Sequence, residues 1–71
     1  MTDVRAEMVA NVWKVVVDEG QQVAEGDTLL VLESMKMEIP VTAERAGTVR
    51  TVPATEGTVV QEGDVLVVLD P

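Results

Sequence analysis

Two stretches decide the fold: NVWKVVVDEGQQVAEGDTLLVLE at residues 11–33 and TVRTVPATEGTVVQEGDVLVVLD at residues 48–70. Offset by 37 positions, they align over 23 residues without a gap, and 11 of the 23 pairs are identical. Such a repeat indicates two copies of one supersecondary unit, neither of which can bury its apolar face alone. We therefore predict that residues 1–71 form a single domain in which the two copies pack together.

Each copy has the same order of strands and turns. A first strand leads to a Glu-Gly turn, a short bridge follows, and a Glu-Gly-Asp turn precedes a second strand. Glycine at these turns suits a positive φ, and Gly and Asp favour turns for backbone reasons, so we interpret the repeated Glu-Gly-Asp as turn chemistry and not as a metal or phosphate loop. The predicted strands are 4–9, 11–17, 29–32, 38–42, 48–52 and 66–69, with bridges through Val23 and Val60.

The composition favours strands throughout. Sixteen valines supply most of the core, Phe and Tyr are absent, and no stretch reads as a convincing helix. Trp13, the only aromatic residue, is expected to pack among the valines. Pro40 cannot donate to a ladder and should lie at a sheet edge or a strand start. The prediction is an all-β domain, a two-sheet sandwich or flattened barrel.

Charge and residue types limit the function. The net charge of −8 disfavours nucleic acid and anionic membrane as partners. No apolar stretch is long enough to span a bilayer, and the N-terminus lacks the pattern of a signal peptide, so we expect a cytoplasmic protein. Because His, Cys and Tyr are absent, we expect no metal site and no catalytic residues.

The midpoint of the chain is Glu33-Ser34-Met35-Lys36-Met37-Glu38. An apolar run precedes it and another follows, which predicts a hairpin with Lys36 at its tip. Lys14, the only other lysine, lies within a strand and should project from the side of a sheet. The repeat would place the counterpart of Lys36 just beyond residue 71, so the hairpin should point away from the chain termini.

The tetrapeptide Ser34-Met35-Lys36-Met37, in a hairpin between two similar halves, resembles the Ala-Met-Lys-Met motif of the biotinyl/lipoyl attachment family. The resemblance covers nearly the whole chain; Ser34 departs from the usual alanine. It implies two small antiparallel sheets related by a pseudo-two-fold axis, a hammerhead-like barrel. It also implies biotin attached covalently to Lys36, with Met35 and Met37 as motif flanks, in a non-catalytic carrier.

The resemblance further implies partners. A biotin protein ligase would modify Lys36, and the carrier, monomeric by itself, would serve a biotin carboxylase and a carboxyltransferase.

Several alternatives stay open. Glu33 and Glu38 are either solvated strand ends or a surface that the ligase recognises. Lys36 could be an ordinary solvated lysine, with Met35 and Met37 folded back onto the core. A lipoyl carrier shares the fold, but its relatives typically have Asp-Lys-Ala around the lysine, so lipoate is the less favoured cofactor. The last alternative is an unmodified structural or binding module.

Overall fold

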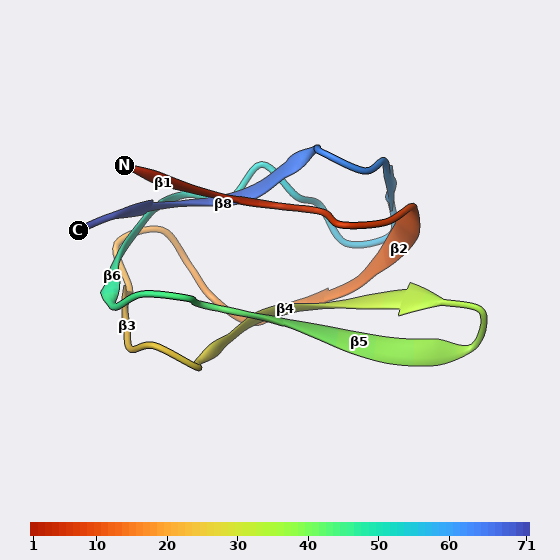
Figure 1. Cartoon of the computed structure of the whole chain (residues 1–71), viewed down its shortest axis with the longest axis horizontal. Coiled ribbons are helices and arrows are strands. Elements are labelled where there is room, and N and C mark those ends of the chain that lie inside the picture. Colours follow the sequence, from red (N-terminus) through yellow and green to blue (C-terminus); the bar gives the residue numbers. More distant parts are fainter.

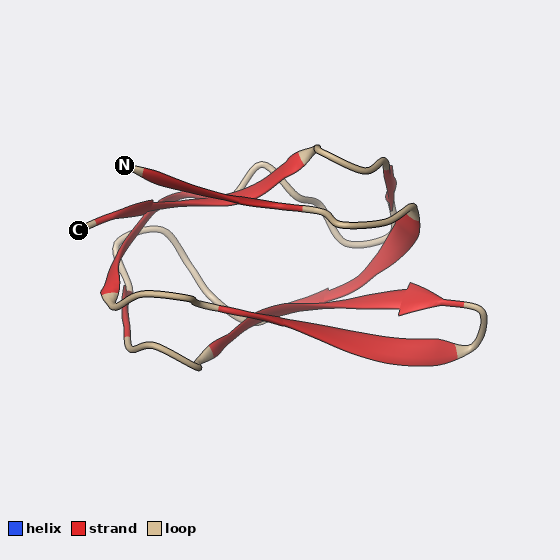
Figure 2. Cartoon of the chain, in the orientation of Figure 1, coloured by secondary structure: helices blue, strands red, loops and turns tan.

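Each copy of the repeat forms the same three strands, and one further strand completes each of two sheets. The computed structural model describes residues 1–71 and has eight strands and no helix (Figures 1 and 2). The strands are β1 (Thr2–Arg5), β2 (Ala10–Val15), β3 (Gln22–Val23), β4 (Thr28–Ser34), β5 (Met37–Thr42), β6 (Gly47–Thr51), β7 (Val59–Val60) and β8 (Val65–Asp70). None of its elements is a helix of the length and apolarity needed to cross a membrane.

The two antiparallel sheets have the same topology. One, which we name the terminal sheet, has the order β1-β8-β6-β3; the other, the lysine sheet, has the order β5-β4-β2-β7. A shift of 37 residues converts β2, β3 and β4 into β6, β7 and β8, and β5 takes the place that β1 has in the terminal sheet. The predicted all-β sandwich with pseudo-two-fold symmetry is confirmed.

Equivalent hydrogen bonds join the two copies. The backbone N–H of Gly20 donates to the carbonyl of Val49, with an N···O distance of 2.7 Å, and the N–H of Gly57 donates to the carbonyl of Val12 at 2.8 Å. Both glycines have a positive φ, 87° and 86°, which a residue with a side chain adopts only at a cost. The first turn of each copy is therefore fixed against the first strand of the other.

The Glu-Gly-Asp turns are held by their own aspartates. The backbone N–H of Ala24 donates to Oδ2 of Asp27 at 2.9 Å, and the N–H of Gln61 donates to Oδ2 of Asp64 at 2.8 Å. Each carboxylate thus supplies an acceptor that the bent backbone would otherwise lack. These bonds support the interpretation of both motifs as turns.

Beta-bulges interrupt the regular alternation of side chains in β4 and β8. Leu29 is the extra residue of β4 against β5, and Leu66 is the extra residue of β8 against β1. A bulge lets two consecutive side chains face the same side. Leu29 and Leu30 are therefore both fully buried, as are Leu66 and Val67.

The core between the sheets is entirely aliphatic and contains no polar side chain. Its largest members come from the strands of both copies, so each half covers the apolar face of the other. The buried residues are Ala6, Ala10, Val12, Val17, Val23, Leu29, Leu30, Leu32, Ala43, Val49, Val60, Leu66, Val67 and Leu69.

Two sequence predictions about local structure are wrong. The strand expected at residues 4–9 is the shorter β1. It ends there because Ala6 leaves the ladder and forms backbone hydrogen bonds with Gly63 and Asp64, in the Glu-Gly-Asp turn of the second copy. Trp13 does not pack in the core: it is the extra residue of a bulge in β2 and stays 50% exposed. Pro40 lies as expected on an edge strand, β5.

The long axis separates the chain ends from the central hairpin. The domain measures 32 × 17 × 17 Å. Both termini lie at one end, and the β4–β5 hairpin reaches the other (Figure 1). This is the arrangement that the repeat predicted for the lysine hairpin.

Candidate functional site

The candidate site is the tip of the β4–β5 hairpin. The last paired residues are Ser34 on β4 and Met37 on β5, so Met35 and Lys36 alone form the turn. Both have a positive φ, 52° for Met35 and 65° for Lys36. Two-residue hairpin turns with positive φ at both positions match the twist of the strands and usually contain Asn and Gly.

Met and Lys are costly residues for such a turn. A left-handed conformation disfavours a residue with a side chain by roughly 1–2 kcal/mol. The ladder from Thr28–Thr42 to Ser34–Met37 holds the two strands together and imposes the turn on these residues. Backbone strain of this kind is common at functional sites, where the fold holds a side chain in a required place.

The side chains of the tip project into solvent. Met35 is 92% exposed and Met37 is 62% exposed, so neither folds back onto the core as the alternative interpretation required. Lys36 is exposed, and its amine makes no hydrogen bond or ion pair. An enzyme can therefore enclose this amine together with both methionine side chains.

Two acidic residues flank the tip. Glu33 and Glu38 lie directly opposite each other in the ladder, one pair below Ser34 and Met37. Both are exposed, and neither has a basic partner. Like charges facing each other across two strands are destabilising, and neither carboxylate is in an ion pair that would offset this repulsion.

The two lysines differ in access. Lys14 lies on β2, which has β4 on one side and β7 on the other. Its side chain stands on the outer face of the lysine sheet opposite Val31. An active site could close around the hairpin tip that carries Lys36, but it could approach Lys14 only from one side.

Every residue that the sequence singled out at the hairpin lies where it was expected. Ser34 and Glu33 end β4, Met37 and Glu38 begin β5, and Met35 and Lys36 form the tip. The left-handed φ of the turn was not foreseen, since neither Met nor Lys signals it.

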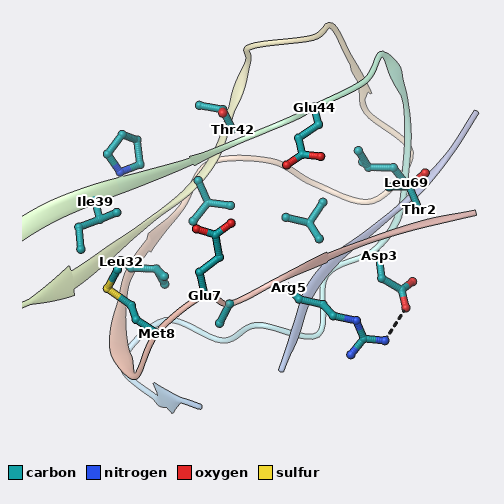
Figure 3. A pocket seen from close by; sticks show the side chains of 14 residues that line it. Thr2, Asp3, Arg5, Glu7, Met8, Leu32, Ile39, Thr42, Glu44 and Leu69 are labelled. Atoms are coloured by element: carbon teal, nitrogen blue, oxygen red, sulfur yellow. Dashed lines mark hydrogen bonds and ion pairs between the residues drawn. The ribbon is translucent and has the colours of Figure 1, made fainter. Parts of the chain in front are cut away.

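A second concave feature lies away from the tip. A groove of about 380 Å³ runs between the edge strands β1 and β5 (Figure 3). Leu32, Ile39 and Leu69 are among its apolar lining residues. Glu7 and Glu44 also line it, and they lie 37 positions apart in the sequence, which is the period of the repeat. Neither residue was predicted as part of a site, although extending the repeat towards the N-terminus matches Glu7 with Glu44.

Comparison with known proteins gives a consistent result. The family model described as "Biotin-requiring enzyme", a biotin/lipoyl domain, matches residues 2–69. A protein named "Biotinylated protein TB7.3 homolog" from Mycolicibacterium smegmatis is 73% identical over 41 residues, 58% of each chain. A "Biotin/lipoyl attachment protein" from Bacillus subtilis is 50% identical over 43 residues, 61% of this chain and 59% of that one. The matches thus span less than two thirds of these relatives.

Solved structures include a region with the same fold as this chain. The urea carboxylase of Kluyveromyces lactis contains a region with a TM-score of 0.90 and 30% identity. It covers 97% of this chain but only 6% of that enzyme. The similarity therefore concerns one small domain of a large carboxylase.

Proposed function

Because the chain belongs to the biotin/lipoyl attachment family, we propose that it is a biotin carrier domain with biotin held in an amide bond to Lys36. The observation that carries this proposal is the strained two-residue turn, which places an unpaired lysine amine at the far end of the domain. The predicted motif flanks, Met35 and Met37, are exposed on either side of that amine.

The residues of the tip fit this attachment. The Lys36 amine would accept the biotinyl group from its adenylate on a biotin protein ligase: an N–C bond forms, AMP leaves, and the nitrogen loses a proton to the ligase. The flexible, polarizable side chains of Met35 and Met37 can adapt to the ligase surface. Glu33 and Glu38 offer it a charged edge below the tip.

After modification, the domain holds the attached biotin and presents it to the partner enzymes. Bound biotin supplies a ureido ring that can carry a carboxyl group between a biotin carboxylase and a carboxyltransferase. The rigid hairpin keeps the attachment point fixed, and the tether raises the effective concentration of the group at both enzymes. The domain itself brings no His, Cys or Tyr to that chemistry.

Residues 1–71 would act as one domain, monomeric by itself and cytoplasmic. Its enzymes would recognise the hairpin end, which lies opposite the chain termini (Figure 1).

Intact mass of the protein from its native host tests the proposal. Biotin, lipoate and no modification give three different masses, and fragmentation locates the modified residue. A biotin mass increment on Lys36 is expected. A lipoyl increment would favour the rival carrier, and an unmodified chain in a host that biotinylates other proteins would favour a binding module.

A further inference from the structure

All four methionines of the chain lie outside the core, which consists only of alanine, valine and leucine. Met35 is the most exposed of them, at 92%, and Met8, which lines the groove, is the least exposed, at 40%. Met1 lies at the terminal end of the domain (Figure 1). Met35 and Met37 stand on either side of Lys36, so two exposed sulfur atoms belong to the residues that flank the candidate attachment point.

An exposed thioether reacts with a peroxide. The sulfur lone pair forms an S–O bond with one peroxide oxygen, the O–O bond breaks, and the proton of the transferred oxygen leaves with the other oxygen as water. The sulfur loses two electrons and the peroxide gains them. The product, methionine sulfoxide, is polar and chiral, and methionine sulfoxide reductases convert it back to methionine. Because the chain has no cysteine, no thiol competes for the oxidant.

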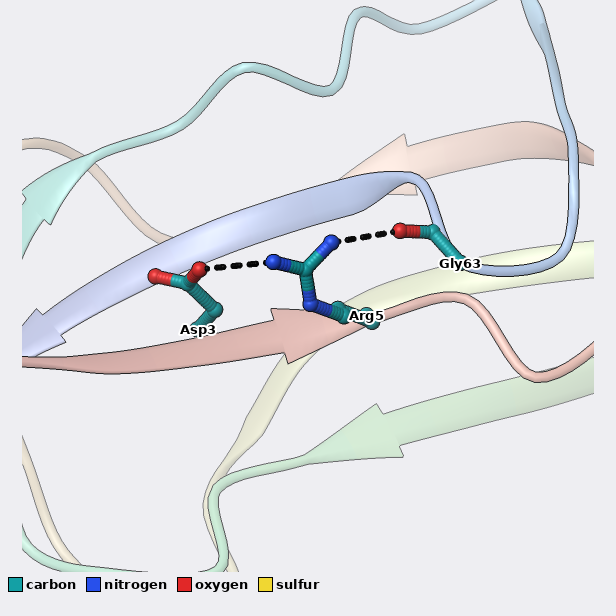
Figure 4. A network of polar contacts seen from close by, with 3 residues as sticks. All are labelled: Asp3, Arg5 and Gly63. Carbon is teal, nitrogen blue, oxygen red and sulfur yellow. Dashed lines mark hydrogen bonds and ion pairs between the residues drawn. The ribbon is translucent and has the colours of Figure 1, made fainter.

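The fold does not depend on the side chains of the tip. No side chain of residues 33–38 takes part in a hydrogen bond or an ion pair. Both ion pairs of the chain lie on the terminal sheet. In one of them Arg5 contacts Asp3 at 3.0 Å and also donates to the carbonyl of Gly63 at 2.8 Å (Figure 4). Oxidation at the tip therefore leaves the core and these contacts unchanged.

We propose that Met35 and Met37 form a reversible oxidation site that controls access of partner enzymes to Lys36. This inference rests on the proposed attachment of biotin to Lys36. The thioethers are apolar and flexible, so an enzyme that encloses the tip can pack against them. A sulfoxide oxygen accepts hydrogen bonds from water, and enclosing it without new partners costs free energy. Oxidation by a peroxide would thus weaken recognition of the tip without altering the lysine amine.

The first measurement locates the oxidation. The protein is treated with increasing hydrogen peroxide, the reaction is quenched, and peptide mass mapping follows each methionine. We expect Met35 and Met37 to gain one oxygen each at lower peroxide than Met8, and we expect the circular dichroism spectrum and the unfolding midpoint to stay as in the untreated protein. Oxidation of Met8 as readily as Met35, or unfolding at the dose that oxidises the tip, would contradict the proposal.

The second measurement follows the initial rate of biotin transfer by biotin protein ligase. Oxidised protein should show a kcat/KM at least about fivefold lower than untreated protein, because its sulfoxide oxygens lose water in the complex. Treatment with methionine sulfoxide reductases should restore the rate. An equal rate for oxidised and untreated protein, or a loss that the reductases do not reverse, would overturn the proposal. Failure of the ligase to label untreated protein would instead contradict the attachment of biotin, and this inference with it.

Met35→Leu combined with Met37→Leu is the matched control. Leucine keeps both flanks apolar but cannot form a sulfoxide, and the variant retains Met1 and Met8. Peroxide should leave its rate of biotin transfer unchanged. The same loss of rate in this variant as in the parent would show that oxidation elsewhere is responsible. Reversal by the reductases is measured on the parent protein, so it decides the question even if the variant does not fold.

Discussion

Replacing Met35 with asparagine should stabilise the domain while leaving Lys36 in place. Met35 has a φ of 52°, and a left-handed residue with an ordinary side chain costs roughly 1–2 kcal/mol. Asparagine tolerates this conformation and is favoured in such hairpin turns. Because the Met35 side chain is 92% exposed, its loss removes almost no buried apolar surface. The expected net gain is therefore about 1 kcal/mol in the free energy of unfolding.

Thermal unfolding followed by far-UV circular dichroism measures this gain. For a domain of this size, about 1 kcal/mol corresponds to a rise of about 4–8 °C in the unfolding midpoint. Met37→Asn is the matched control, because Met37 is exposed but lies on β5 without a positive φ, and asparagine is a poor strand former. That control should show no gain. An unchanged or lowered midpoint for Met35→Asn, or equal effects of both substitutions, would refute the reasoning from backbone strain.

Three further predictions concern the turns, the core and the motif flanks. Gly57→Ala should lower the free energy of unfolding in urea by roughly 1–2 kcal/mol from its φ of 86° alone, since open space surrounds the position; a neutral result would contradict the left-handed turn. Leu66→Ala should cost about 2–5 kcal/mol, because this leucine is 0% exposed, and a loss below about 1 kcal/mol would show that the bulge does not bury it. Changing Met35 to Asp together with Met37 to Ala should shift modification in vitro from biotin ligase towards lipoate ligase; unchanged rates with both ligases would show that the flanks do not discriminate.

The repeat made most of the fold predictable. Matching residues 11–33 with 48–70 predicts equivalent strands and turns, and the structure contains them in equivalent sheets. The hairpin could be predicted for a related reason: Lys36 and its neighbours interrupt two apolar runs at the one place where the repeat has no second copy. The missing second copy and the interrupted apolar runs thus both predicted a hairpin at Lys36.

The bulges could not be predicted from the residues of single strands. Trp13 lies among valines, but it follows Val12, which faces the core, so alternation alone places it outside. The register shift between Val12 and Lys14 adds Lys14 to the same outer side. A bulge is a product of pairing between distant strands, which the residues of one strand alone do not specify.

The most direct test of the central claim compares Lys36→Arg with Lys14→Arg. Each variant and the parent would be incubated with biotin protein ligase, biotin and ATP, then analysed by intact mass and peptide mapping. We predict that the parent and Lys14→Arg gain one biotin on Lys36, while Lys36→Arg gains none and retains the circular dichroism spectrum and unfolding midpoint of the parent. Biotin on Lys14, or biotin that persists in folded Lys36→Arg, would show that Lys36 is not the attachment site.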